Sequence, residues 1–168
     1  MIFYLQAFAL AAFTAVMVAA AFEDFRRQII PNLLPIILCA VWPLYLLATG
    51  PTFYGAGSAV ACAAAVFCGG AILFRCGCLG GGDVKLLSAA TLWVGPGGTL
   101  DLLMVTVLLG GPIALFFLIP QGRKLAGAIR RAMGQNTVQA ERVLAMPMPY
   151  GIAIAGAAMI VTLPPFFG

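Results

Sequence analysis

Apolar residues run along this chain in long blocks that are separated by short polar or glycine-rich breaks. A helix rises about 1.5 Å per residue, so about 20 apolar residues cross a hydrocarbon core about 30 Å thick. The pattern predicts six membrane-spanning helices, at about residues 2–22, 33–48, 53–74, 84–95, 100–119 and 148–163. We expect a charged turn at Glu23 to Gln28, and Pro31 suits the first turn of the second helix.

Composition gives the same class of protein. Hydrophobic residues make up 63% of the 168 positions and charged residues 8%, with a mean hydropathy of +1.09. A soluble domain of this size cannot hide that much apolar surface from water. We therefore expect an all-α polytopic membrane protein that forms a single integral-membrane domain over residues 1–168, in contact with the lipid bilayer. The first block lacks a positively charged start, so we expect it to be retained rather than cleaved as a signal peptide.

The fourth block, at 84–95, is short for a span. It is either a re-entrant hairpin or a true span that starts below the membrane surface. If it spans, all nine basic residues fall on one side of the membrane, which the positive-inside rule makes the cytoplasm. We take that arrangement, with a cytoplasmic loop at 120–147 and both termini outside the cytoplasm. Within the loop, the apolar residues Leu125, Ile129 and Met133 predict an interfacial amphipathic helix.

The residue inventory excludes several kinds of chemistry. The chain has no histidine, which removes Ser-His and Cys-His nucleophile pairs and histidine-based zinc sites. Cys76 and Cys78 lack a second ligand pair for zinc, so we expect no metal and leave the role of this cysteine pair open. The basic residues are confined to loops, and we expect no nucleic-acid partner.

Two aspartates are the candidates for acid–base chemistry. Asp24 follows the first block, and Asp83 stands behind Gly80, Gly81 and Gly82, where it can cap the fourth helix. The predicted topology places both carboxylates on the cytoplasmic face, where a close pair would share one proton and could act as acid and base.

A purely structural interpretation of each aspartate also stands. In that interpretation Asp83 is only a helix cap neutralised by Lys85 or by an arginine, and Asp24 only pairs with Arg26 or Arg27.

Three motifs resemble those of the type IV prepilin peptidase family. Gly80 to Leu87 reads GGGDVKLL and looks like the family's GxGD motif with its Val-Lys-Leu continuation. Asp24, seven residues before Pro31 in Ile30-Pro31-Asn32, is similar to the first catalytic motif. The segment at 147–153, PMPYGIA, resembles the C-terminal Pro-Tyr-Gly element.

The resemblance implies an aspartic endopeptidase at the cytoplasmic face of a bacterial inner membrane. Its substrates would be prepilin and pseudopilin proteins, which lose a short basic leader ahead of a hydrophobic segment. Asp24 and Asp83 would be the catalytic pair. The other motif residues would bind substrate: Gly80, Gly82, Lys85, Pro31, Asn32, Pro149, Tyr150 and Gly151.

The chain resembles the short form associated with Flp-type pili. Larger members carry a cytoplasmic domain with zinc-binding cysteine pairs, and they N-methylate the product with S-adenosylmethionine. This chain has no such domain between its first spans, which puts methylation in doubt, and we expect no cofactor. The oligomeric state stays open.

Two other interpretations compete with a prepilin peptidase. Presenilin-like GxGD proteases place a Tyr-Asp motif inside a span, whereas here Phe22-Glu23-Asp24 ends one. A small ion-coupled transporter or a secretion-apparatus subunit could use the aspartates to bind cations, but carboxylates near the bilayer midplane would then be expected.

Overall fold

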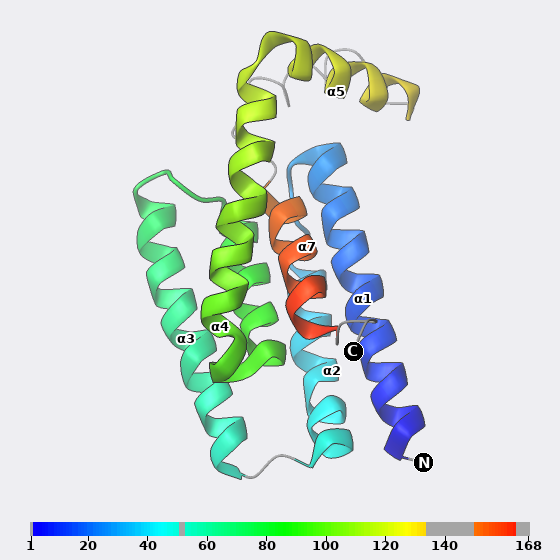
Figure 1. Ribbon diagram of the computed structural model, residues 1–168, viewed down its shortest axis with the longest axis vertical. Helices are drawn as coiled ribbons and strands as arrows, with labels where there is room; N and C mark the ends of the chain where they lie inside the picture. Colours follow the sequence, from blue (N-terminus) through cyan, green and yellow to red (C-terminus); the bar gives the residue numbers. More distant parts are fainter. Residues whose placement is uncertain (1, 51–52, 134–149, 164–168) are drawn as a thin grey trace.

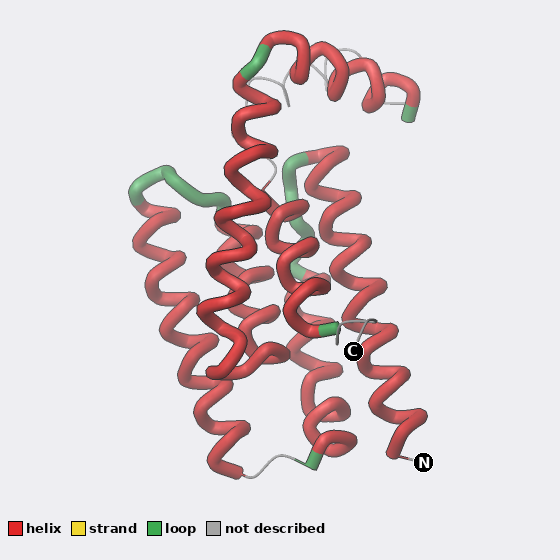
Figure 2. Tube along the Cα trace, viewed as in Figure 1, coloured by secondary structure: helices red, strands yellow, loops and turns green. Residues whose placement is uncertain are grey.

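The computed structural model describes residues 2–50, 53–133 and 150–163, and in these ranges the chain is helical with short connections (Figures 1 and 2). The elements are α1 (Ile2–Arg27), α2 (Leu33–Thr49), α3 (Phe53–Arg75), α4 (Gly81–Leu118), α5 (Pro120–Ala132) and α7 (Tyr150–Thr162). The described part contains no strand, and the protein is an all-α polytopic membrane protein, as its composition predicts.

Three of these helices are long and apolar enough to cross a membrane: α1, α3 from Gly55, and α4. Two shorter apolar helices, α2 and α7, complete the bundle. Large apolar side chains cover much of its outer surface, which is the arrangement expected when the surrounding solvent is lipid.

Helix α4 is two antiparallel arms rather than one rod. Gly95 has φ 68° and ψ −174°, a conformation open almost only to glycine, and Pro96 follows it. The chain turns back there, so that a first arm (residues 81–94) and a second arm (residues 96–118) lie side by side (Figure 1). This break falls at the end of the predicted span at 84–95.

Helix boundaries differ from expectation at three places near the aspartates. Helix α1 continues to Arg27, so Glu23 and Asp24 belong to its last turns and the predicted charged turn is wrong. Helix α2 begins at Leu33 with Asn32 as its N-cap, which places Pro31 before the helix rather than in its first turn. Helix α4 begins at Gly81 with Gly80 as its N-cap, so Asp83 lies in the first turn and is not the cap.

The core forms where α1, α2, α7 and the first arm of α4 meet. Phe13 and Tyr45 pack on either side of Trp93, with ring centroids 4.8 and 5.2 Å from the indole. The Trp93 indole N–H donates to the Leu38 carbonyl at 3.2 Å, which satisfies its polar atom inside the apolar core.

Helix α7 brings its neighbours close because its buried face is made mainly of glycine and alanine. Gly151, Ala155 and Ala158 are buried on this face, and α7 packs against both α1 and α4. Small residues let helix backbones approach without an intervening side chain. Figure 1 shows α7 lying between α1 and the arms of α4.

The two ends of the bundle differ in charge. Arg26 and Arg27 end α1, Arg75 ends α3, and Lys85 lies in the second turn of α4, all at the end of the bundle that α5 covers (Figure 1). Helix α5 adds four basic residues there and is amphipathic, with Ala126 turned inward. The opposite end holds Gly50 and the Gly95 turn.

This arrangement predicts the sidedness of the loops in the membrane. Reporter fusions after Gly50 and Gly97 should report the non-cytoplasmic side, and a fusion after Gly77 the cytoplasmic side, because the basic end should stay in the cytoplasm. Alkaline phosphatase and fluorescent-protein fusions measure the two sides independently. Equal sidedness of the Gly77 and Gly97 fusions would instead make the first arm of α4 re-entrant.

Candidate active site

Asp24 lies on the buried face of α1. The buried residues of this helix recur every three or four positions, at Ala9, Phe13, Val16, Met17, Ala20 and Asp24. This spacing defines one helical face, and Asp24 is its last member before the helix ends. Only 4% of the Asp24 surface is exposed, although the residue stands next to the charged Glu23 and Arg26. The carboxylate therefore points into the bundle and not toward the aqueous side.

Asp83 occupies the matching position on α4. It begins the buried face that continues through Leu86, Leu87 and Ala90, and 8% of its surface is exposed. The Gly80 backbone N–H donates a hydrogen bond to its carboxylate. A Cβ atom at Gly80 would lie 2.7 Å from Asp83 Oδ2, so glycine is needed for this close approach.

The fold brings the two carboxylates within electrostatic range of each other, although they are 59 positions apart in the sequence. Ile30 forms part of the wall beside both. Its side chain lies 3.0 Å from a Cβ placed at Gly82 and 2.9 Å from one placed at Gly151. In this nearly dry setting two negative charges repel strongly, so the pair is expected to hold one proton between them.

Gly151 supplies the closest approach to Asp24 from α7. A Cβ atom on Gly151 would lie 2.8 Å from Asp24 Oδ2 and 2.9 Å from Asp24 Cγ. The first turn of α7 thus meets the carboxylate of α1 through a residue that has no side chain. Gly151 belongs to the Pro-Tyr-Gly motif, and its place beside Asp24 gives that motif a physical role.

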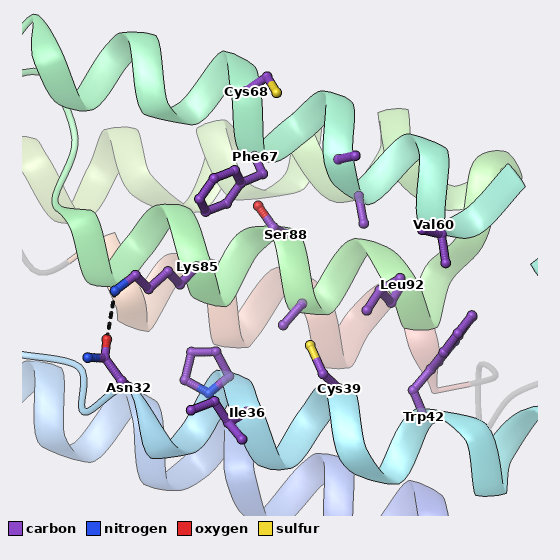
Figure 3. A pocket seen from close by; sticks show the side chains of 14 residues that line it. Asn32, Ile36, Cys39, Trp42, Val60, Phe67, Cys68, Lys85, Ser88 and Leu92 are labelled. Carbon is purple, nitrogen blue, oxygen red and sulfur yellow. Dashed lines mark hydrogen bonds between the residues drawn. The ribbon is translucent and has the colours of Figure 1, made fainter. Parts of the chain in front are cut away.

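Lys85 and Asn32 are joined directly. The Lys85 ammonium donates to Asn32 Oδ1 at 2.9 Å, which links the N-cap of α2 to the second turn of α4 (Figure 3). Pro31 precedes this N-cap in the short connection after α1. The two N-terminal motifs are therefore in contact with each other at the basic end of the bundle.

Tyr150 and Pro149 are the remaining motif residues. The Tyr150 ring lies against Gly110 in the second arm of α4. A Cβ atom placed on Gly110 would be 3.4 Å from this ring. Pro149 lies outside the described residues. Cys76 and Cys78 are free and exposed in the connection before Gly80.

The sequence did not lead us to predict that Ile30 lines the site. Nothing in its apolar identity distinguishes it from the residues around it. Its position was one available signal that it is buried, because Ile30 is an apolar residue between the charged end of α1 and Pro31. The connection also contains Gln28 at φ 51°, an uncommon conformation for a residue other than glycine, which turns the chain toward the bundle.

This geometry defines a class of site: two buried carboxylates from different helices, near one end of a helical membrane bundle. A family model described as the type IV leader peptidase family matches residues 11–115, which is well over half of the chain. The chain belongs to the type IV leader peptidase family, and it is a membrane-embedded peptidase. The match includes both aspartates and the Gly80 to Leu87 motif, and it ends before Tyr150 and Gly151. No curated protein and no solved structure matches the chain.

Substituting alanine for Gly151 should impair the peptidase. The added methyl group would push the Asp24 carboxylate away from its position beside Asp83, and we expect at least a tenfold loss in leader cleavage with the protein still present in the membrane. Cleavage of a co-expressed leader-bearing substrate, followed on immunoblots, measures this effect.

Gly111→Ala is the matched control, because a Cβ atom at Gly111 meets nothing within 4 Å. It should retain wild-type activity. Full activity in the Gly151→Ala variant would show that the contact between α7 and Asp24 is unimportant.

Proposed function

We propose that this protein is an aspartic endopeptidase that removes the leader peptide of Flp-type prepilins at the cytoplasmic face of the bacterial inner membrane. The observation that carries the proposal is the pairing of Asp24 with Asp83. Both carboxylates are buried, both lie on core-facing helix positions, and both are at the basic end of the bundle. An ordinary helix cap or surface ion pair would not need this burial.

A proton-sharing pair of carboxylates is sufficient for peptide hydrolysis. The ionised carboxylate takes a proton from a water molecule as the water oxygen attacks the peptide carbonyl carbon. The protonated carboxylate donates to the carbonyl oxygen, which gives a neutral tetrahedral intermediate. The carboxyl that took the water proton then donates it to the amide nitrogen, while the other carboxylate takes the proton of one hydroxyl of the intermediate as the carbonyl re-forms. The C–N bond breaks, which releases the leader and the new N-terminus. The cycle ends with one proton again shared by the pair.

The surroundings of Asp83 support access by an extended peptide. Gly80 is exposed and Gly81 and Gly82 are half-buried, so a substrate strand can reach their backbone at the start of α4 from the side not occupied by Asp83, Phe74 and Ile30. Lys85 and Asn32 hold α2 against α4 beside this approach. Their proposed role is to fix the geometry of the entrance and to contact the substrate.

The proposed position in the membrane follows from charge and depth. With the basic end in the cytoplasm, the aspartates lie in the last turns of α1 and the first turn of α4, near the cytoplasmic interface. Six spans then place both termini outside the cytoplasm. An ion-coupled transporter would instead be expected to hold its carboxylates at broken helices near the midplane, whereas the break in α4 lies at Gly95, far along the arm from Asp83.

Asp24→Asn and Asp83→Asn should each abolish leader removal, because asparagine keeps the shape and cannot exchange the proton. The expected loss of rate is at least about 10²-fold, with protein levels unchanged. The measurement is the ratio of unprocessed to processed prepilin when each variant is co-expressed with an Flp-type prepilin from the same genome.

Asp101→Asn provides the control. Asp101 is exposed, lies in the second arm of α4 near the Gly95 turn, and should tolerate the change without loss of processing. Retained processing in the Asp24 or the Asp83 variant would refute the proposed dyad.

A further inference from the structure

An open apolar groove runs between α2, α3 and the first arm of α4, with a volume of about 760 Å³ (Figure 3). Trp42 and Phe67 are large side chains on two of its sides. Its middle is lined by small residues, which are Ala63 and Ala64 from α3 and Ser88 and Ala89 from α4. We call these four small residues the bed of the groove.

The polar groups of the groove are concentrated at one end. Lys85 and Asn32 meet there, and the buried Ser88 hydroxyl is satisfied by the Val84 carbonyl at 2.7 Å. From Lys85 the groove continues along α4 to Leu92, which is about 10 Å at 1.5 Å per residue. An occupant must therefore be apolar along its length and polar only at the end where Lys85 lies.

The polar end lies at the depth of the aspartates. Lys85 is two residues after Asp83 on α4, which separates them by about 3 Å along the helix axis. The two side chains leave different faces of the helix, since positions i and i+2 are about 200° apart around a helix of 3.6 residues per turn. A chain that leaves the groove beside Lys85 must pass the start of α4 to reach Asp83, and this start consists of Gly80, Gly81 and Gly82.

The side of the groove toward the surrounding medium is open. Ile36 on α2 is 60% exposed and Val60 and Phe67 on α3 are 50% and 46% exposed, so in a membrane the groove faces lipid. A segment that is already in the bilayer can enter sideways without crossing water. The small residues of the bed allow a helix backbone to approach closely, as at helix–helix interfaces in membranes.

We propose that this groove is the docking site for the apolar helical segment of the substrate, which holds the scissile bond at the level of the dyad. The inference rests on the proposed function, since it requires a substrate whose cleavage site adjoins a membrane-embedded segment. The seated helix ends near Lys85, and the chain continues in extended form over the glycines of α4 to Asp24 and Asp83.

Native cysteines provide a direct test of occupancy. Cys39 on α2 and Cys68 on α3 both line the groove, whereas Cys62 on α3 does not. Single-cysteine proteins that retain one of the three, in an Asp83→Asn background that leaves substrate uncleaved, are co-expressed with Flp-type prepilin. The prepilin carries one cysteine at successive positions of its apolar segment, and copper-phenanthroline oxidises adjacent thiols to disulfides.

Docking in the groove predicts prepilin adducts with Cys39 and Cys68 at helical spacing along the segment, and none above background with Cys62. Absence of adducts at both groove cysteines, or an equal yield at Cys62, overturns the proposal. A lipid acyl chain as the resident occupant would give the first of these outcomes.

Substitutions in the bed of the groove give a second, kinetic test in the active protein. Ala64→Phe fills the groove, and Ala65→Phe adds the same bulk to the neighbouring exposed position outside it. We expect at least a tenfold lower rate of prepilin processing for Ala64→Phe and an unchanged rate for Ala65→Phe. Equal rates in the two variants refute docking in the groove while leaving the dyad in place, whereas processing that survives Asp24→Asn or Asp83→Asn refutes the dyad itself.

Discussion

Two buried carboxylates that interact electrostatically inside an apolar bundle create a problem that the rest of this structure must accommodate. Asp24 and Asp83 are almost fully removed from solvent, and each lies on the core-facing side of its helix. Two such charges repel each other in a low-dielectric setting, so we expect the pair to hold one proton. That state combines an acid and a base at one place, which is the requirement for hydrolysing a peptide bond without histidine, serine or a metal.

Glycine makes this close pairing possible. Gly80 leaves room for the Asp83 carboxylate, and Gly151 leaves room for that of Asp24, since a Cβ atom at either position would lie within 3 Å of a carboxylate oxygen. Gly95 lies far from the aspartates, but its positive φ folds α4 back on itself. The second arm of α4 therefore returns to the end of the bundle where Asp83 lies. In the proposed docking mode, the groove beside Lys85 holds the membrane-embedded part of the substrate.

The sequence was sufficient for the architecture and for the family, because both rest on strong local signals. Long apolar blocks predict membrane helices, and three motifs in the right order along the chain predict the family. Local signals did not predict how the helix ends are arranged. Glu23 and Asp24 are charged and suggested a turn, yet Asp24 completes a core-facing stripe that begins at Ala9, and the helix continues to Arg27. The motif at 147–153 pointed to Gly151 as a site residue, but the closeness of Gly151 and Ile30 to the aspartates depends on contacts between distant segments, which local patterns do not predict.

The pH dependence of kcat/KM for prepilin cleavage tests the shared proton most directly. A dyad that needs one ionised and one protonated carboxylate predicts a bell-shaped profile. Activity falls in acid because both carboxylates become protonated and the base is lost. It falls in alkali because both become ionised and the acid is lost. A single limb that rises with pH to a plateau would show that the reaction needs only a base, and it would contradict a shared proton between Asp24 and Asp83.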